Sequence, residues 1–194
     1  YFDAERPRVA KAYDRKGLVL LCSSFSKTLA PGYRVGWVAP GRFQREVERH
    51  KVLTNIAGSI PTQLAVAEFL ANGGYEHHLR RLRKTYKKQT RLMAEAVLRA
   101  FPTGTAVTRP SGGHVLWVEF PEYVDSLILY EECLQAGITI APGPIFSSGE
   151  RYRNFVRLNA GVWSRRVEEA LHTIGDLAAR RRGDDAGSNI SSTG

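Results

Sequence analysis

One long amphipathic helix dominates the hydrophobic pattern of this 194-residue chain and limits the folds open to it. The apolar side chains that recur at helical spacing are Leu79, Leu82, Tyr86, Met93, Val97 and Ala100. This spacing predicts a single helix of roughly 25 residues, from about Tyr75 to Phe101. Because one side of such a helix is apolar throughout, that side must lie against a hydrophobic core.

The other face of the predicted helix is strongly basic. It carries Arg80, Arg81, Arg83, Lys84, Lys87, Lys88 and Arg91. The chain has a net charge of +9, which raises nucleic-acid binding as an alternative. However, basic residues that alternate with a regular apolar stripe, without aromatic residues for base stacking, indicate a solvated helix face. We therefore expect this helix to have a structural role.

Short strands and helices alternate along the rest of the chain. The pattern predicts strands at 17–21, 35–39, 106–109, 114–119, 139–141 and 154–159. It predicts helices at 42–54, 61–71, 126–136 and from about 167 to 180, with Ser164 as the cap of the last helix. From Gly183 onward the sequence is polar and typical of a disordered tail. The alternation favours an α/β fold class.

Lys27 lies where the first apolar run ends in small polar residues. Residues 17–21 are typical of a strand covered on both faces, and Lys27 lies on the connection to the next strand. A lysine amine condenses with an aldehyde, and a phosphate on that aldehyde needs donors such as Ser24, Ser26 and Arg34. The alternative is an ordinary surface lysine in a polar turn. Lys27 is thus a candidate anchor for a carbonyl cofactor.

Residues 24–37 closely resemble the lysine segment of class I/II aminotransferases, the fold-type I enzymes that use pyridoxal 5'-phosphate (PLP). Within that superfamily the segment looks most like the aminotransferase-like domains of MocR-type regulators in the GntR family. The resemblance implies the end of a large PLP-binding domain, a long interdomain helix, a small C-terminal α/β domain and a disordered tail. Their expected ranges are 1–72, 73–101, 102–182 and 183–194.

The resemblance also implies roles for residues of the lysine segment. Lys27 would bind PLP covalently and move the proton at the α-carbon of the substrate. Ser24 and Arg34 would hold the phosphate of the cofactor, because a guanidinium grips a phosphate in two places. Ser26 is a weaker candidate for the same phosphate.

A second match lies in residues 153–161, which resemble the strand that carries the arginine for the substrate carboxylate. Arg157 would be that arginine, since a planar guanidinium holds a carboxylate through two parallel hydrogen bonds. On composition alone, Arg151 and Arg153 are equally eligible. His114 begins a strand without an acidic partner nearby in sequence, so we expect a structural role for it.

The chain is short for a complete fold of this type, which needs about twice its length. We expect it to be the C-terminal half of a larger protein, because the family's partner for the pyridine nitrogen precedes the lysine. Cofactor binding by this half alone should then be weak. We expect a homodimer, with residues 54–61 near the interface; Ser59 would either reach the neighbouring phosphate or cap the next helix.

Two functions remain open for the intact protein. It is either the effector domain of a regulator, performing amino-group transfer or aldimine exchange with an amino acid or amine, or a stand-alone aminotransferase acting on amino acids and 2-oxo acids. A nonfunctional remnant is a third possibility. In the regulator, DNA would be bound only through a further N-terminal domain. The sequence does not identify the amino acid.

Cysteine usage and hydropathy indicate the compartment. Cys22 and Cys133 have no spacing typical of a metal site or a disulfide framework. No apolar stretch approaches the length that crosses a bilayer, so we expect no membrane contact. A reducing cytoplasm is the expected location.

Overall fold

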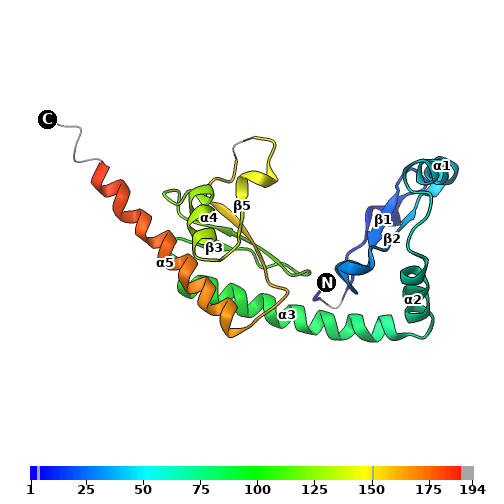
Figure 1. Ribbon diagram of the computed structural model, residues 1–194, viewed down its shortest axis with the longest axis horizontal. Coiled ribbons are helices and arrows are strands. Elements are labelled where there is room, and N and C mark those ends of the chain that lie inside the picture. Colours follow the sequence, from blue (N-terminus) through cyan, green and yellow to red (C-terminus); the bar gives the residue numbers. More distant parts are fainter. Residues whose placement is uncertain (4, 150, 189–194) are drawn as a thin grey trace. The chain divides into compact units, whose positions relative to one another are not determined.

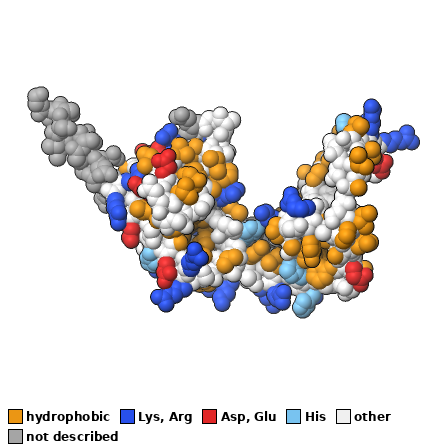
Figure 2. Space-filling view, viewed as in Figure 1, with side chains coloured by type: hydrophobic (Ala, Val, Ile, Leu, Met, Phe, Trp, Pro, Cys, Tyr) orange, Lys and Arg blue, Asp and Glu red, His pale blue; other side chains and the backbone are white. Residues whose placement is uncertain are grey.

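The computed structural model describes residues 1–3, 5–149 and 151–188, which divide into two compact units (Figure 1). The first unit contains Tyr1 and residues 3–83, and the second contains Phe2 and the chain from Lys84 onward. The division falls inside a long helix, α3 (Gly74–Ala100). This helix confirms the one predicted from the apolar stripe. Leu79, Leu82 and Tyr86 are half-buried, whereas most of the basic residues on this helix are exposed (Figure 2).

The first unit contains a two-stranded antiparallel ribbon and two helices. The strands are β1 (Leu21–Ser24) and β2 (Gly36–Ala39), and the helices are α1 (Gln44–Thr54) and α2 (Ile60–Ala71). In the ribbon, Leu21 lies opposite Ala39 and Ser24 lies opposite Gly36. The residues of β1 after Leu21 are exposed, so the prediction of a strand covered on both faces is wrong for this unit.

The first strand begins at Leu21 rather than at residue 17, because Asp14 binds the preceding backbone. Its carboxylate accepts hydrogen bonds from the amides of Leu18 and Val19, both at 3.0 Å. Those amides are therefore not available to a strand ladder. The bond from Val19 and the ammonium of Lys11, 3.0 Å away, hold the pKa of Asp14 well below its usual range.

The helices of the first unit begin close to the predicted positions. A short 3-10 turn (Gly41–Phe43) precedes α1, which begins at Gln44. Pro61 lies in the first turn of α2, as expected for a residue without an amide hydrogen. Ser59 occupies the N-cap position but makes no side-chain capping bond; its carbonyl accepts the amide of Gln63 at 3.2 Å.

The second unit is built around a four-stranded antiparallel sheet with the strand order β3-β4-β6-β5. The strands are β3 (Ala106–Val107), β4 (Val115–Glu119), β5 (Ala141–Pro142) and β6 (Phe155–Asn159). β3 is shorter than predicted, although the amide of Thr108 still donates to the carbonyl of Trp117 at 3.0 Å. β5 begins two residues later than predicted, at Ala141.

The helices of this unit pack on one face of the sheet. Besides the second part of α3, they are α4 (Ser126–Gln135) and α5 (Arg165–Ser188). The shared core contains Met93, Val97, Leu116, Val118, Leu129, Cys133, Val156, Leu158, Leu171 and Ile174. Burial in this core raises the pKa of the Cys133 thiol to about 11. Because buried and exposed residues alternate along β4 and β6, the opposite face carries Trp117 and Arg157.

The last helix begins as predicted and ends later. The amide of Val167 donates to the hydroxyl of Ser164 at 3.3 Å, which confirms the predicted cap. However, α5 continues to Ser188 instead of ending near Arg180, so the start of the expected tail is helical. Residues 189–194 of that tail lie outside the described residues. Within the described part of the chain, no helix has the length and apolar character needed to span a membrane.

Candidate cofactor and ligand site

Lys27 lies in a tight turn that directly follows β1. The amide of Phe25 donates to the carbonyl of Val35 at 3.0 Å, and its carbonyl accepts the amides of Leu29 and Ala30 at 2.8 and 3.1 Å. These bonds close the turn around the lysine. Lys27 is exposed, and no hydrogen bond or ion pair joins its amine to another described residue. The amine is therefore accessible for a reaction with a ligand.

The start of α3 fixes this turn at the residue next to the lysine. The hydroxyl of Tyr75 donates to the Thr28 hydroxyl at 2.9 Å, and Nε2 of His78 lies 2.9 Å from the Thr28 carbonyl oxygen. The buried ring of Phe25 meets the Tyr75 ring edge to face, with centroids 5.6 Å apart. Thr28 is thus held by a side-chain contact and a backbone contact. Both contacts help to position Lys27.

The register of the ribbon brings the three predicted phosphate donors to the end that carries Lys27. Ser24 lies opposite Gly36, and the bond from the Phe25 amide to the Val35 carbonyl keeps Ser26 and Arg34, the residues next to this pair, at the same end of the ribbon. The Ser24 hydroxyl accepts the amide of Ser26 at 3.3 Å. The structure therefore gathers an amine, two hydroxyl groups and a guanidinium, and residues 21–37 include no acidic side chain. This donor set fits an aldehyde that also carries a phosphate.

Arg34 has an unusual backbone conformation. Its φ angle of 53° lies in the left-handed region, which few residues other than glycine adopt. It ends a 3-10 turn (Pro31–Tyr33), where its amide and its Nη1 both donate to the carbonyl of Pro31, at 3.4 and 3.3 Å. Strained residues of this kind cluster at functional sites. Here the backbone conformation sets the direction in which the Arg34 side chain leaves the turn.

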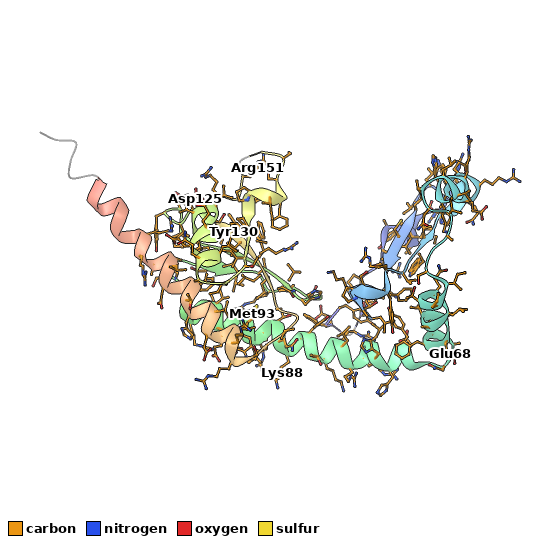
Figure 3. All side chains as sticks on the ribbon, in the orientation of Figure 1. Glu68, Lys88, Met93, Asp125, Tyr130 and Arg151 are labelled. Carbon is orange, nitrogen blue, oxygen red and sulfur yellow. The ribbon has the colours of Figure 1, made fainter. Side chains whose placement is uncertain are left out.

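The structure distinguishes the three arginines that were equally eligible for a carboxylate ligand. Arg153 binds Asp125, with Nε 3.0 Å from Oδ2. Burial alone would raise the pKa of Asp125, but Arg153 and the amides of Leu127 and Ile128 lower it below its usual value. Arg151 lies at the outer end of a loop, away from the sheet (Figure 3).

Arg157 has free donors and, unlike Arg151, lies within the sheet. It lies in β6, opposite Trp117 of β4 and Ala141 of β5, and its side chain is exposed. Its guanidinium carbon lies 4.6 Å from the centroid of the Phe146 ring. No described hydrogen bond or ion pair occupies its N–H groups, so Arg157 keeps the geometry needed to bind a carboxylate. Lys27 and Arg157 belong to different compact units.

His114 packs against the long helix. Its ring lies 4.7 Å from that of Tyr86, and its carbonyl accepts the amide of Ala160 at 2.7 Å. These contacts support the prediction of a structural role. The sequence analysis missed Thr28, Tyr75 and His78. The available signal was the pair Tyr75 and His78, which are three residues apart and so share one face of the helix.

Curated relatives match most of the chain. It is 41% identical over 182 residues to the HTH-type transcriptional regulator YdcR of Escherichia coli (strain K12), a match that covers 93% of this chain and 39% of YdcR. It is 33% identical over 177 residues to the aminotransferase SSO0104 of Saccharolobus solfataricus, covering 90% of this chain and 44% of that protein. The chain therefore spans about two fifths of these relatives. No family model matches it.

Solved aminotransferases share its fold. The multiple substrate aminotransferase of Thermococcus profundus aligns over 94% of this chain and 46% of its own, with a TM-score of 0.85 and 26% identity. The kynurenine aminotransferase of Pyrococcus horikoshii aligns over 94% and 45%, with a TM-score of 0.81 and 30% identity. The α-aminoadipate aminotransferase LysN of Thermus thermophilus, solved with N-(5'-phosphopyridoxyl)-L-leucine, has a TM-score of 0.86 at 25% identity.

These similarities confirm the resemblance found in residues 24–37. The chain has the fold of the fold-type I aminotransferases and corresponds to the C-terminal part of that fold. Among its relatives are HTH-type regulators of the MocR kind, which carry an aminotransferase-like domain.

Proposed function

We propose that this chain is the PLP-binding, aminotransferase-like part of a GntR/MocR-type transcriptional regulator. The observation that carries the proposal is the exposed amine of Lys27, held in a rigid turn at the end of the ribbon that also presents Ser24, Ser26 and Arg34. Sequence similarity favours the regulator over a stand-alone aminotransferase, because YdcR and YjiR are 41% identical to this chain, against 33% for SSO0104.

Each residue of the proposed site has a physical task. Bound PLP supplies an aldehyde and an electron-withdrawing ring. The amine of Lys27 would hold the aldehyde group of the cofactor covalently, and it would carry the proton at the α-carbon of an amino acid. Ser24, Ser26 and Arg34 hold the phosphate, and Arg157 holds the α-carboxylate through two parallel hydrogen bonds. In the regulator, differential binding of an amino acid or amine would shift the domain between two conformations.

The partners of the intact protein are part of this proposal. They are an amino acid or amine and a 2-oxo acid, together with DNA bound through the HTH-type segment that the regulator relatives possess. The ranges 1–72, 73–101 and 102–182 would correspond to the end of the large domain, the linking helix and the small domain. We place the protein in the cytoplasm.

Trapping with borohydride tests the role of Lys27. The chain is incubated with PLP, reduced, digested and analysed by mass spectrometry. We expect Lys27 to carry the reduced adduct at PLP concentrations that leave Lys51 unmodified, because Lys51 is exposed in the same unit but lies on α1 without the donor set. Equal modification of the two lysines would reduce Lys27 to an ordinary surface lysine and remove the basis of the proposal.

An exposed apolar surface supports the proposed homodimer. It consists of Val52 and Leu53 on α1, Ile56 in the connection, and Ile60 and Leu64 on α2. Ile56 is 91% exposed, which is costly for an apolar side chain unless a second copy covers it. This surface includes part of residues 54–61, the segment expected near the interface.

Sedimentation velocity tests the homodimer. We expect Leu64→Asp to weaken self-association by about tenfold or more, since a charge would be buried in the interface. Val162→Asp is the matched control, because Leu64 and Val162 are each 65% exposed and Val162 lies in the other unit. A Leu64→Asp variant that associates as strongly as the Val162→Asp control would rule out this surface as the interface.

A further inference from the structure

Four aromatic side chains form a connected group beside Arg157. This aromatic cluster consists of Trp117, Phe146, Tyr152 and Phe155. The Trp117 ring stacks on Phe155 and meets Phe146 and Tyr152 edge to face, with centroid distances of 5.5 Å in all three pairs. Trp117 also lies directly opposite Arg157 in the sheet. The cluster and the free guanidinium are therefore neighbours within one unit.

The backbone holds this cluster in a fixed arrangement. Tyr152 has a φ angle of 66°, a left-handed conformation that is strained for an aromatic residue. Gly143, which begins the 3-10 turn ending at Phe146, packs so closely on this segment that a Cβ atom would lie 2.1 Å from the Tyr152 carbonyl oxygen. The same Cβ would lie 3.0 Å from Cβ of Phe155. The two segments that supply the rings are thus locked together, and the rings are preorganised.

Phe146 supports Arg157 without occupying its hydrogen-bond donors. A ring beside a guanidinium attracts the cation through its π-system, and the N–H groups remain available for a carboxylate. Phe146 and Tyr152 are nevertheless 41% and 42% exposed. Aromatic surface that is fixed but still open to solvent gains stability when an apolar ligand group covers it. A ligand held by Arg157 could place its side chain on this surface.

Charges around the cluster disfavour a ligand with an acidic side chain. Arg153, which follows Tyr152 in the chain, binds Asp125, and Arg151 lies at the outer end of the loop (Figure 3). Glu119 is exposed on the face of β4 that carries Trp117 and lies opposite Phe155. A second carboxylate placed on the cluster would approach this acid and be repelled by it. The combination fits a ligand with one carboxylate and an uncharged, apolar side chain.

We propose that the aromatic cluster is the subsite for the ligand side chain, and that it selects amino acids and 2-oxo acids with aromatic or large apolar side chains. Phe146 has two parts in this selection: it positions Arg157, and it contributes apolar surface to the ligand. The inference rests on the proposed function for the assignment of Arg157 as the carboxylate-binding residue.

Titration of the chain with phenylpyruvate and with pyruvate tests this selection. Both probes carry the same 2-oxo carboxylate, and they differ only in the phenyl group. Binding is followed through the indole N–H signal of Trp117 in ¹H–¹⁵N NMR spectra, assigned with a Trp117→Phe variant. We expect phenylpyruvate to bind about tenfold more tightly or better, because burying a ring against the cluster removes apolar area from water. Arg157→Gln should weaken both probes.

Substitutions of Phe146 separate its two contributions. Phe146→Leu retains apolar surface but removes the π-system. It should weaken the binding of both probes by a similar factor and keep most of the preference for phenylpyruvate. Phe146→Ala should weaken the binding of both probes and also bring the ratio of the affinities for phenylpyruvate and pyruvate close to one. Phe146→Tyr, the matched control, should retain both affinities. The dispersion of the NMR spectra shows whether each variant is folded.

Several outcomes would overturn the inference: equal binding of the two probes, tighter binding of 2-oxoglutarate, a preference unchanged in Phe146→Ala, or no saturable change at Trp117. The titration does not involve Lys27, so the two proposals fail separately. If Lys27 is trapped by PLP but the preference is absent, only the subsite is wrong. If the preference is present but Lys27 is not trapped, only the proposed function is wrong.

Discussion

Replacement of Gly175 with valine is expected to unfold the second unit or to lower its stability by about 3 kcal/mol or more. Gly175 lies in α5, where this helix passes the end of α3. A Cβ atom at this position would lie 2.0 Å from the carbonyl oxygen of Ala100 and 2.8 Å from its carbonyl carbon. Because the obstacle is backbone, no rotamer change relieves the clash. The two helices would have to separate and open the shared core.

Urea unfolding monitored by far-UV circular dichroism measures this effect. Gly149→Ala is the control, because a Cβ atom at Gly149 meets nothing within 4 Å and its backbone does not have a positive φ. That control should change stability by no more than about 0.5 kcal/mol. If Gly175→Val unfolds at the same urea concentration as the parent chain, the packing of α5 on α3 is not as described.

The same contact connects stability to the ligand site. α3 and α5 bury the face of the sheet formed by Leu116, Val118, Val156 and Leu158, and Arg157 stands between two of these residues on the opposite face. A shift of the helices would therefore disturb the strand that presents the guanidinium. We expect variants that loosen this core to weaken carboxylate binding as well.

Local periodicity was sufficient to predict the elements whose residues contact their own neighbours in sequence. The stripe on α3 and the Ser164 cap are of this kind. The start of β1 could not be predicted in this way. The Asp14 carboxylate accepts hydrogen bonds from the amides of Leu18 and Val19, and hydropathy does not show the loop geometry that brings these groups together. An apolar run alone does not show where its backbone donors are used.

The candidate site shows the same limit. The motif around Lys27 identified the amine and its donors, but the contacts of Thr28 with Tyr75 and His78 join residues 47 and 50 positions apart. Composition left Arg151, Arg153 and Arg157 equivalent. Only the fold shows that Arg153 is bound to Asp125, 28 residues away. Contacts between distant segments therefore decide which charged residues remain available to a ligand.

Arg34→Asn is expected to reduce the advantage of PLP over pyridoxal in the trapping of Lys27 by about 10- to 100-fold. The two aldehydes differ in the phosphate, so their ratio isolates its contribution. A guanidinium forms charge-assisted hydrogen bonds with a phosphate, and asparagine cannot replace them. Asparagine is chosen because it tolerates the left-handed φ of 53° at this position better than alanine. The change thus removes the charge with little effect on the turn.

Arg45→Asn provides the control. Arg45 is exposed on α1 in the same unit, so this substitution removes the same charge at a position away from the donor set. The ratio of PLP to pyridoxal adducts at Lys27, measured by mass spectrometry, should stay at the parent value in this variant. Adducts at Lys51 serve as an internal reference for general lysine reactivity. An Arg34→Asn variant with the parent ratio would show that the guanidinium does not hold the phosphate. If the ratio of PLP to pyridoxal adducts falls equally in both variants, Arg34 acts only through long-range electrostatic attraction. Added salt would weaken such an attraction.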